Sequence, residues 1–126
     1  MIFELFLKFY QNKILHNFEA VEIFSFDGLT SKKVMAKVDT GADRTSIDES
    51  LAKELGLLSE SNVIKEITYK SGLAKSQKRP IVYAKFKIKK ETINSEVNVV
   101  DRAHLKFQIL IGRKDMGGFL IWLQSK

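Results

Sequence analysis

At 126 residues, 44% of them apolar, the chain is long enough for one folded domain and too short for two, and its composition excludes a disordered tail. It contains no cysteine, which excludes disulfides and thiolate metal sites, and its two histidines lie far apart in the sequence, so we expect no metal ion and no other cofactor. The net charge of +6 fits an acidic partner, but many lysines alternate with apolar residues, which favours exposed strand faces over a nucleic-acid-binding surface.

Residues 1–18 differ from the rest of the chain and are predicted to form an N-terminal extension, helical or mobile. Ile2, Leu5, Phe6 and Phe9 recur at helical spacing, which predicts a short helix docked on the domain. The segment lacks a basic start and a small-residue cleavage site, so it is a poor signal peptide. No apolar run reaches the ~20 residues that span a bilayer. We therefore expect a cytoplasmic protein with no membrane partner.

The domain proper is predicted to cover residues 19–126 and to begin with a hairpin. An apolar run over 21–26 indicates a strand, Asp27-Gly28 a turn, and 32–39 the returning strand. The hairpin would place Asp39 at its far end. A short helix is expected next, because Ser46 or Asp48 can cap it and Gly56 is a typical C-terminal stop.

The second half of the chain reads as further short strands. Strands are predicted over 63–70, 80–88 and 93–100, then a fully buried strand over 107–113 and a final apolar strand over 119–123. Many short strands with turns and one clear helix indicate an all-β class, a small closed barrel with one short helix.

The segment Asp39-Thr40-Gly41 is the candidate for catalytic chemistry. Ordinary turns contain the same residue types, and three residues alone do not distinguish a turn from a catalytic loop. Two carboxylates within hydrogen-bond distance share a proton, so that one can activate a water molecule while the other protonates a carbonyl oxygen. The chain has a single Asp-Thr-Gly, so such a pair requires a second copy of the chain.

Several motifs, in order, resemble one family. The segment 38–45, followed about seventy residues later by 109–113, is similar to the pattern of retropepsin-like aspartic proteases. Ser71-Gly72, 78–82, Asp101-Arg102 and 111–116 further resemble the bacterial and archaeal retropepsin-like group associated with RimK-type ligases, often labelled putative ATP-dependent zinc proteases. The chain shows neither a zinc-ligand motif nor a phosphate-binding glycine loop, so neither zinc nor ATP is carried over.

The resemblance implies a retropepsin-like barrel acting as a homodimeric endopeptidase on peptides or proteins. It implies that Asp39, Thr40 and Gly41 form the catalytic loop, that Ile111 and Gly112 support it, and that Arg113 pairs with Asp43. A flap over roughly residues 69–81 would cover the site. The residues implied to contact substrate are Ala42, Asp43, Tyr69, Ser71, Gly72 and Leu73.

Two other functions stay open at the level of sequence. A non-catalytic module on the same fold could recognise acidic or ligase-modified peptides through Lys75, Lys78 and Arg79. Nucleic-acid binding ranks last, because few aromatic residues accompany the basic ones there. His104 is expected on the surface, and Trp122 in the core or at a dimer interface.

Overall fold

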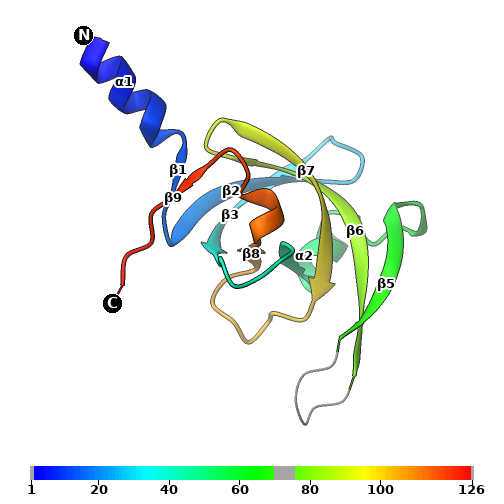
Figure 1. The fold of residues 1–126 in the computed structure, drawn as a ribbon. Helices are drawn as coiled ribbons and strands as arrows, with labels where there is room; N and C mark the ends of the chain where they lie inside the picture. Colours follow the sequence, from blue (N-terminus) through cyan, green and yellow to red (C-terminus); the bar gives the residue numbers. More distant parts are fainter. Residues whose placement is uncertain (1, 70–75, 126) are drawn as a thin grey trace.

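The computed structural model describes residues 2–69 and 76–125 as a small β barrel with appended ends (Figure 1). The helices are α1 (Ile2–Gln11) and α2 (Glu49–Glu54), with 3-10 turns η1 (Glu60–Asn62) and η2 (Arg113–Asp115). The strands are β1 (Ile14–Leu15), β2 (Phe18–Phe24), β3 (Ser31–Val38), β4 (Ser46–Asp48), β5 (Val63–Tyr69), β6 (Gln77–Ile88), β7 (Glu91–Val100), β8 (Ile109–Ile111) and β9 (Leu120–Ile121).

The barrel closes because its first and last strands pair. Strands β2, β3, β8, β4, β7 and β6 are hydrogen-bonded in that order, and β6 pairs again with β2. Strand β5 lies outside this ring, on the edge of β6. Closure leaves the inward side chains of these six strands facing one core. The predicted all-β class and closed barrel are confirmed.

The alternation of β6 shows how the sequence specifies the core. Phe86 and Ile88 are buried, whereas Lys85 and Lys87 between and beside them are exposed. Side chains of a strand point alternately to its two faces, so charged and apolar residues separate without any break in the ladder. The predicted exposed lysine face is thus confirmed for this strand.

The helix after the Asp39 loop begins at Glu49, directly after Asp48, one of the two caps expected for it. Residues 46–48 form strand β4, which pairs in parallel with β7 and antiparallel with β8. Asp48 stands at the N-cap position of α2, but its side chain makes no capping bond to the helix backbone. Its carboxylate instead accepts a hydrogen bond from the Arg102 N–H at 2.7 Å. The predicted N-cap position of Asp48 is therefore confirmed without a capping bond from its side chain, whereas Ser46 lies in β4, because pairing with distant strands outweighs the local signal.

The chain ends do not pack as predicted. Helix α1 forms, but none of its residues is buried, and it extends away from the barrel instead of docking (Figure 1). Strand β9 is shorter than predicted and pairs in parallel with β1. Trp122, just after it, is 63% exposed, which excludes the core position proposed for it. Together, α1 and the end of the chain present a large unpartnered apolar surface.

Candidate active site

Asp39 lies at the end of β3, in the loop that connects this strand to β4. Its backbone N–H donates to the Ile111 carbonyl at 2.9 Å, which continues the parallel pairing of β3 with β8. Its side chain is half-buried, and the Oδ1 atom accepts the N–H of Gly41 at 2.9 Å. These bonds hold one face of the carboxylate in a defined direction and leave the other accessible.

Gly112 is required by how closely β8 approaches this loop. A Cβ atom on Gly112 would lie 2.4 Å from the Arg44 carbonyl carbon and 2.7 Å from its oxygen. Such contacts are far shorter than ordinary van der Waals distances, and the atoms met are backbone, which has no rotamer to escape into. Glycine at this position therefore lets the two segments lie side by side.

Arg113 joins the Asp39 loop to the end of β8. Its Nη1 donates to the Thr40 carbonyl at 2.7 Å, and its Nη2 forms an ion pair with Asp43, the pairing that the resemblance implied. Its backbone N–H donates to the Ala42 carbonyl at 2.8 Å. Because both partners are at least half exposed, the ion pair itself adds little stability, and its effect is to orient the loop.

A buried hydroxyl–carboxylate network behind the loop was not predicted from the sequence. Asp115 accepts hydrogen bonds from Thr45 Oγ1 at 2.5 Å and Ser95 Oγ at 2.7 Å. Thr45 Oγ1 in turn accepts the Gly112 N–H at 3.1 Å. Three segments distant in sequence are thereby tied together beneath Asp39. The residues are ordinary one by one, so no local signal in the sequence marks them.

Arg102 lies in the loop before β8 and is half-buried. Its Nε donates to the Phe107 carbonyl at 2.9 Å. Burial lowers the pKa of Arg102, while the charges of Asp48 and, next, Asp39 act in the opposite direction. The guanidinium is therefore within electrostatic range of the Asp39 carboxylate.

A pocket of about 570 Å³ opens beside Val38, the residue before Asp39. We call it the Arg102 pocket. Three cationic side chains and several apolar ones line it, a combination typical of ligand sites. Its lining residues are Asn17, Phe18, Lys37, Val38, Arg102, Leu105, Lys106, Phe107 and Leu110.

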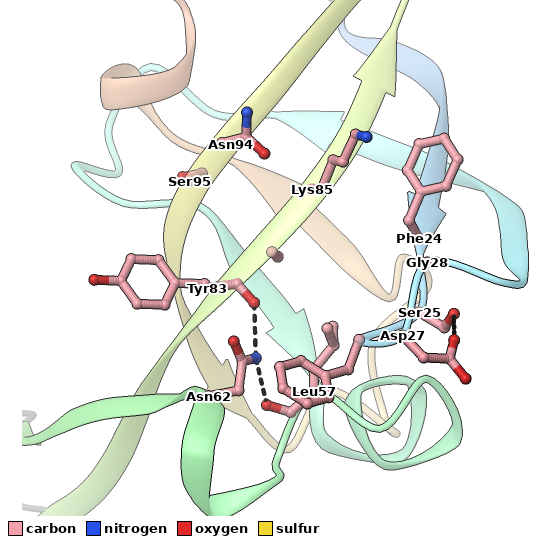
Figure 2. A pocket seen from close by; sticks show the side chains of 12 residues that line it. Phe24, Ser25, Asp27, Gly28, Leu57, Asn62, Tyr83, Lys85, Asn94 and Ser95 are labelled. Atoms are coloured by element: carbon pink, nitrogen blue, oxygen red, sulfur yellow. Dashed lines mark hydrogen bonds between the residues drawn. The ribbon is translucent and has the colours of Figure 1, made fainter.

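Another hollow, of about 490 Å³, lies on the outside of the barrel between β2, β6 and β7 (Figure 2). Tyr83 and Phe24 border it, and Asn62 at its floor donates to the carbonyls of Leu57 and Tyr83. None of the residues that line it belongs to the Asp39 loop. This hollow is separate from the candidate active site.

The predicted flap is only partly covered by the structure. Strands β5 and β6 form the expected hairpin, with Tyr69 at the end of β5 paired with Gln77. Ser71, Gly72, Leu73 and Lys75 lie outside the described residues. Lys78 and Arg79 help to line a smaller pocket of about 310 Å³ near the end of the hairpin where Tyr69 pairs with Gln77. Closure of a flap over Asp39 therefore stays a prediction.

Two further findings concern the described part of the chain. Within residues 2–69 and 76–125, no group of three His, Asp or Glu side chains is arranged to hold a metal ion. In the same residues, no helix is long and apolar enough to cross a membrane. His104 is exposed, as expected.

The family follows from the sequence match to a family model described as aspartyl protease, which covers residues 23–114 and so includes both Asp39 and Arg113. The chain belongs to the aspartyl protease family. The matched region begins in β2 and ends just after Arg113, so it spans most of the barrel and includes the Asp39 loop. No curated protein matches the chain significantly.

Solved structures of low sequence identity share the fold of this chain. The simian foamy virus (mac) protease has a TM-score of 0.55 at 19% identity, with 78% of this chain and 89% of that chain covered. A Legionella pneumophila protein of unknown function, Lpg0085, has a TM-score of 0.53 at 17% identity, with 90% and 94% covered. A foamy viral protease-reverse transcriptase, solved with an RNA/DNA hybrid, has a TM-score of 0.54 at 18% identity; 82% of this chain but 12% of that chain is covered.

Proposed function

We propose that the protein is a homodimeric aspartic endopeptidase that hydrolyses peptide bonds with a pair of Asp39 carboxylates, one from each subunit. The observation that carries the proposal is the loop itself. Asp39 is half-exposed at a strand end, oriented by the Gly41 N–H and backed by Gly112 and Arg113, within a chain of the aspartyl protease family. A single Asp-Thr-Gly per chain makes the second subunit necessary.

The chemistry follows from two carboxylates that share one proton. The ionised Asp39 removes a proton from a water molecule, whose oxygen attacks the carbonyl carbon of the substrate. The protonated Asp39 of the partner subunit gives its proton to the carbonyl oxygen, so no full negative charge develops there. Return of a proton to the amide nitrogen then allows the C–N bond to break. Thr40 and Gly41 hold the two loops, and we assign Ala42, Asp43 and the β5–β6 hairpin to substrate contact.

The surface beside Asp39 supports a two-fold dimer. The Val38 N–H donates to the Asn17 carbonyl at 2.8 Å, and the Asn17 side chain exchanges hydrogen bonds with the Gln124 backbone. The C-terminal segment thus lies next to the strand that ends at Asp39. It carries exposed apolar residues, among them Leu120 and Trp122. Burying this surface against its own copy would bring two Asp39 loops together around one axis.

Finer assignments rest on the motifs. The order of Asp39-Thr40-Gly41, Asp101-Arg102 and Ile111-Gly112-Arg113 supports a place in the RimK-associated retropepsin-like group. The chain has no cysteine and needs no oxidising compartment, which is consistent with the cytoplasmic location that we propose. The barrel residues 19–126 would form the catalytic domain, with 1–18 as an extension that contributes to the dimer.

The test compares wild type with Asp39→Asn on an unfolded protein and a peptide library, with cleavage followed by mass spectrometry. Asp27→Asn is the matched control, because Asp27 is an exposed carboxylate in the turn between β2 and β3. We expect cleavage by wild type and by the control, and none by Asp39→Asn, while sedimentation shows dimers for all three proteins. Wild-type cleavage by Asp39→Asn would refute the proposal. Peptide binding without cleavage by any form would favour the non-catalytic module.

A further inference from the structure

The Arg102 pocket next to the catalytic loop is cationic, and the feature is not explained by the barrel fold. Lys37, Arg102 and Lys106 all line it, and within the described residues none of them has a carboxylate at ion-pair distance. No lining residue is acidic. Like charges gathered around one cavity repel one another, so the arrangement favours an anionic occupant.

The acidic groups nearby lie outside the lining of the pocket. Asp48 is 2% exposed and accepts the backbone N–H of Arg102. Asp101 is exposed and accepts the N–H of Ala103 at 3.0 Å. Neither residue lines the pocket. Asp39, which follows Val38 in the chain, does not line the pocket either.

The apolar part of the pocket indicates what kind of anion fits. Phe18 and Phe107 stack with their ring centroids 4.8 Å apart, and Leu110 beside them is half-buried. Lys106 Nζ lies 5.7 Å from the Phe107 ring centroid. Such walls suit methylene groups, whereas the cationic groups suit a terminal carboxylate. A glutamate side chain combines the two.

We propose that the Arg102 pocket binds the acidic side chain, glutamate above all, of the substrate residue that adjoins the scissile bond. The inference rests on the proposed endopeptidase function and adds a substrate class to it. Val38 lines the pocket and Asp39 follows it, so a residue held there lies next to the reacting carbonyl. In a two-fold dimer each subunit contributes one such pocket, and acidic residues are preferred on both sides of the bond.

The experiment uses the full-length dimer and internally quenched peptides that differ only by Glu, Gln or Lys at the residue beside the bond cleaved in the library. We expect kcat/KM for the Glu peptide to exceed that of the Gln peptide about tenfold, which corresponds to ~1.4 kcal/mol. In Arg102→Gln and in Lys37→Gln/Lys106→Gln the ratio falls toward one, and the Gln peptide is still cleaved. The control Lys33→Gln/Lys90→Gln removes two exposed lysines outside the pocket and outside the β5–β6 hairpin, and keeps the ratio.

A binding measurement separates this inference from the proposed function. Fluorescence anisotropy with Asp39→Asn measures the affinity for the same peptides without requiring cleavage. Tighter binding of the Glu peptide, lost in Asp39→Asn/Arg102→Gln, supports the pocket even if wild type cleaves nothing. Equal binding and equal cleavage of the Glu and Gln peptides would overturn the inference and leave the endopeptidase proposal standing.

Discussion

Substituting Gly112 by alanine tests the close approach of β8 to the Asp39 loop. The added Cβ would lie 2.4 Å from the carbonyl carbon, 2.7 Å from the oxygen and 2.8 Å from the nitrogen of Arg44. An ordinary contact needs about 3.5 Å, so the two backbones must separate by roughly 1 Å. This movement strains the Gly112–Thr45 hydrogen bond beneath Asp39.

The expected cost has a structural and a catalytic part. Forcing extra atoms into a packed site costs about 1–3 kcal/mol of unfolding free energy. A displacement of about 1 Å in a reacting group can lower the rate roughly 100-fold. We therefore expect Gly112→Ala to lower the free energy of unfolding by about 1–3 kcal/mol, measured by urea denaturation. We also expect it to reduce the rate of cleavage far more than its loss of folded protein explains.

Gly117→Ala is the matched control. A Cβ on Gly117 would meet nothing within 4 Å, and the residue is exposed. Its stability and activity should stay near those of wild type. If Gly112→Ala unfolds at the same urea concentration as Gly117→Ala and cleaves peptides equally fast, then the close approach of β8 does not hold the Asp39 loop in place.

Three further outcomes are expected. Thr45→Val leaves the buried Asp115 carboxylate and the Gly112 N–H each short of a partner, so urea denaturation should show a loss of about 1–3 kcal/mol, whereas Thr45→Ser should restore most of it. Burial alone would raise the pKa of Asp48, but hydrogen bonds from Ser50 and the Arg102 N–H outweigh it and hold the pKa below its ordinary value of 3.8. The stabilisation by the ionised Asp48 is therefore complete above that value and is lost as the pH falls through the lower folded pKa. The free energy of unfolding, measured from pH 6 to pH 2, should fall less steeply for Asp48→Asn than for wild type. Equal slopes for the two proteins would contradict this role of Asp48. Phe6→Glu and Trp122→Glu should convert dimers to monomers in sedimentation and leave the barrel intact, because both side chains are exposed. Leu29→Glu, the control, also changes an exposed side chain and should leave the dimer unchanged. Dimers of wild-type affinity in all three variants would exclude the surface of α1 and the end of the chain as the interface.

Local patterns made part of the fold predictable. The alternation along 80–88 assigns each side chain to one face, and this requires no knowledge of distant residues. Local patterns likewise predict the hairpin that ends at Asp39 and the end of a buried strand at the glycine after Ile111. By contrast, the local sequence of β4 fits the start of a helix as well as a strand, and only its pairing with β7 and β8, about fifty and sixty positions away, decides for a strand. Such non-local ladders leave no trace in a short window of sequence.

The sequence by itself determined that the chain holds a single Asp-Thr-Gly, and it therefore predicts that a carboxylate pair requires a second chain. Only the tertiary structure decided what supports and surrounds that residue. The network of Thr45 and Asp115, the Arg102 pocket and the uncovered surface of α1 each depend on segments brought together by barrel closure. Their residues are chemically ordinary, and position in space alone gives them a role.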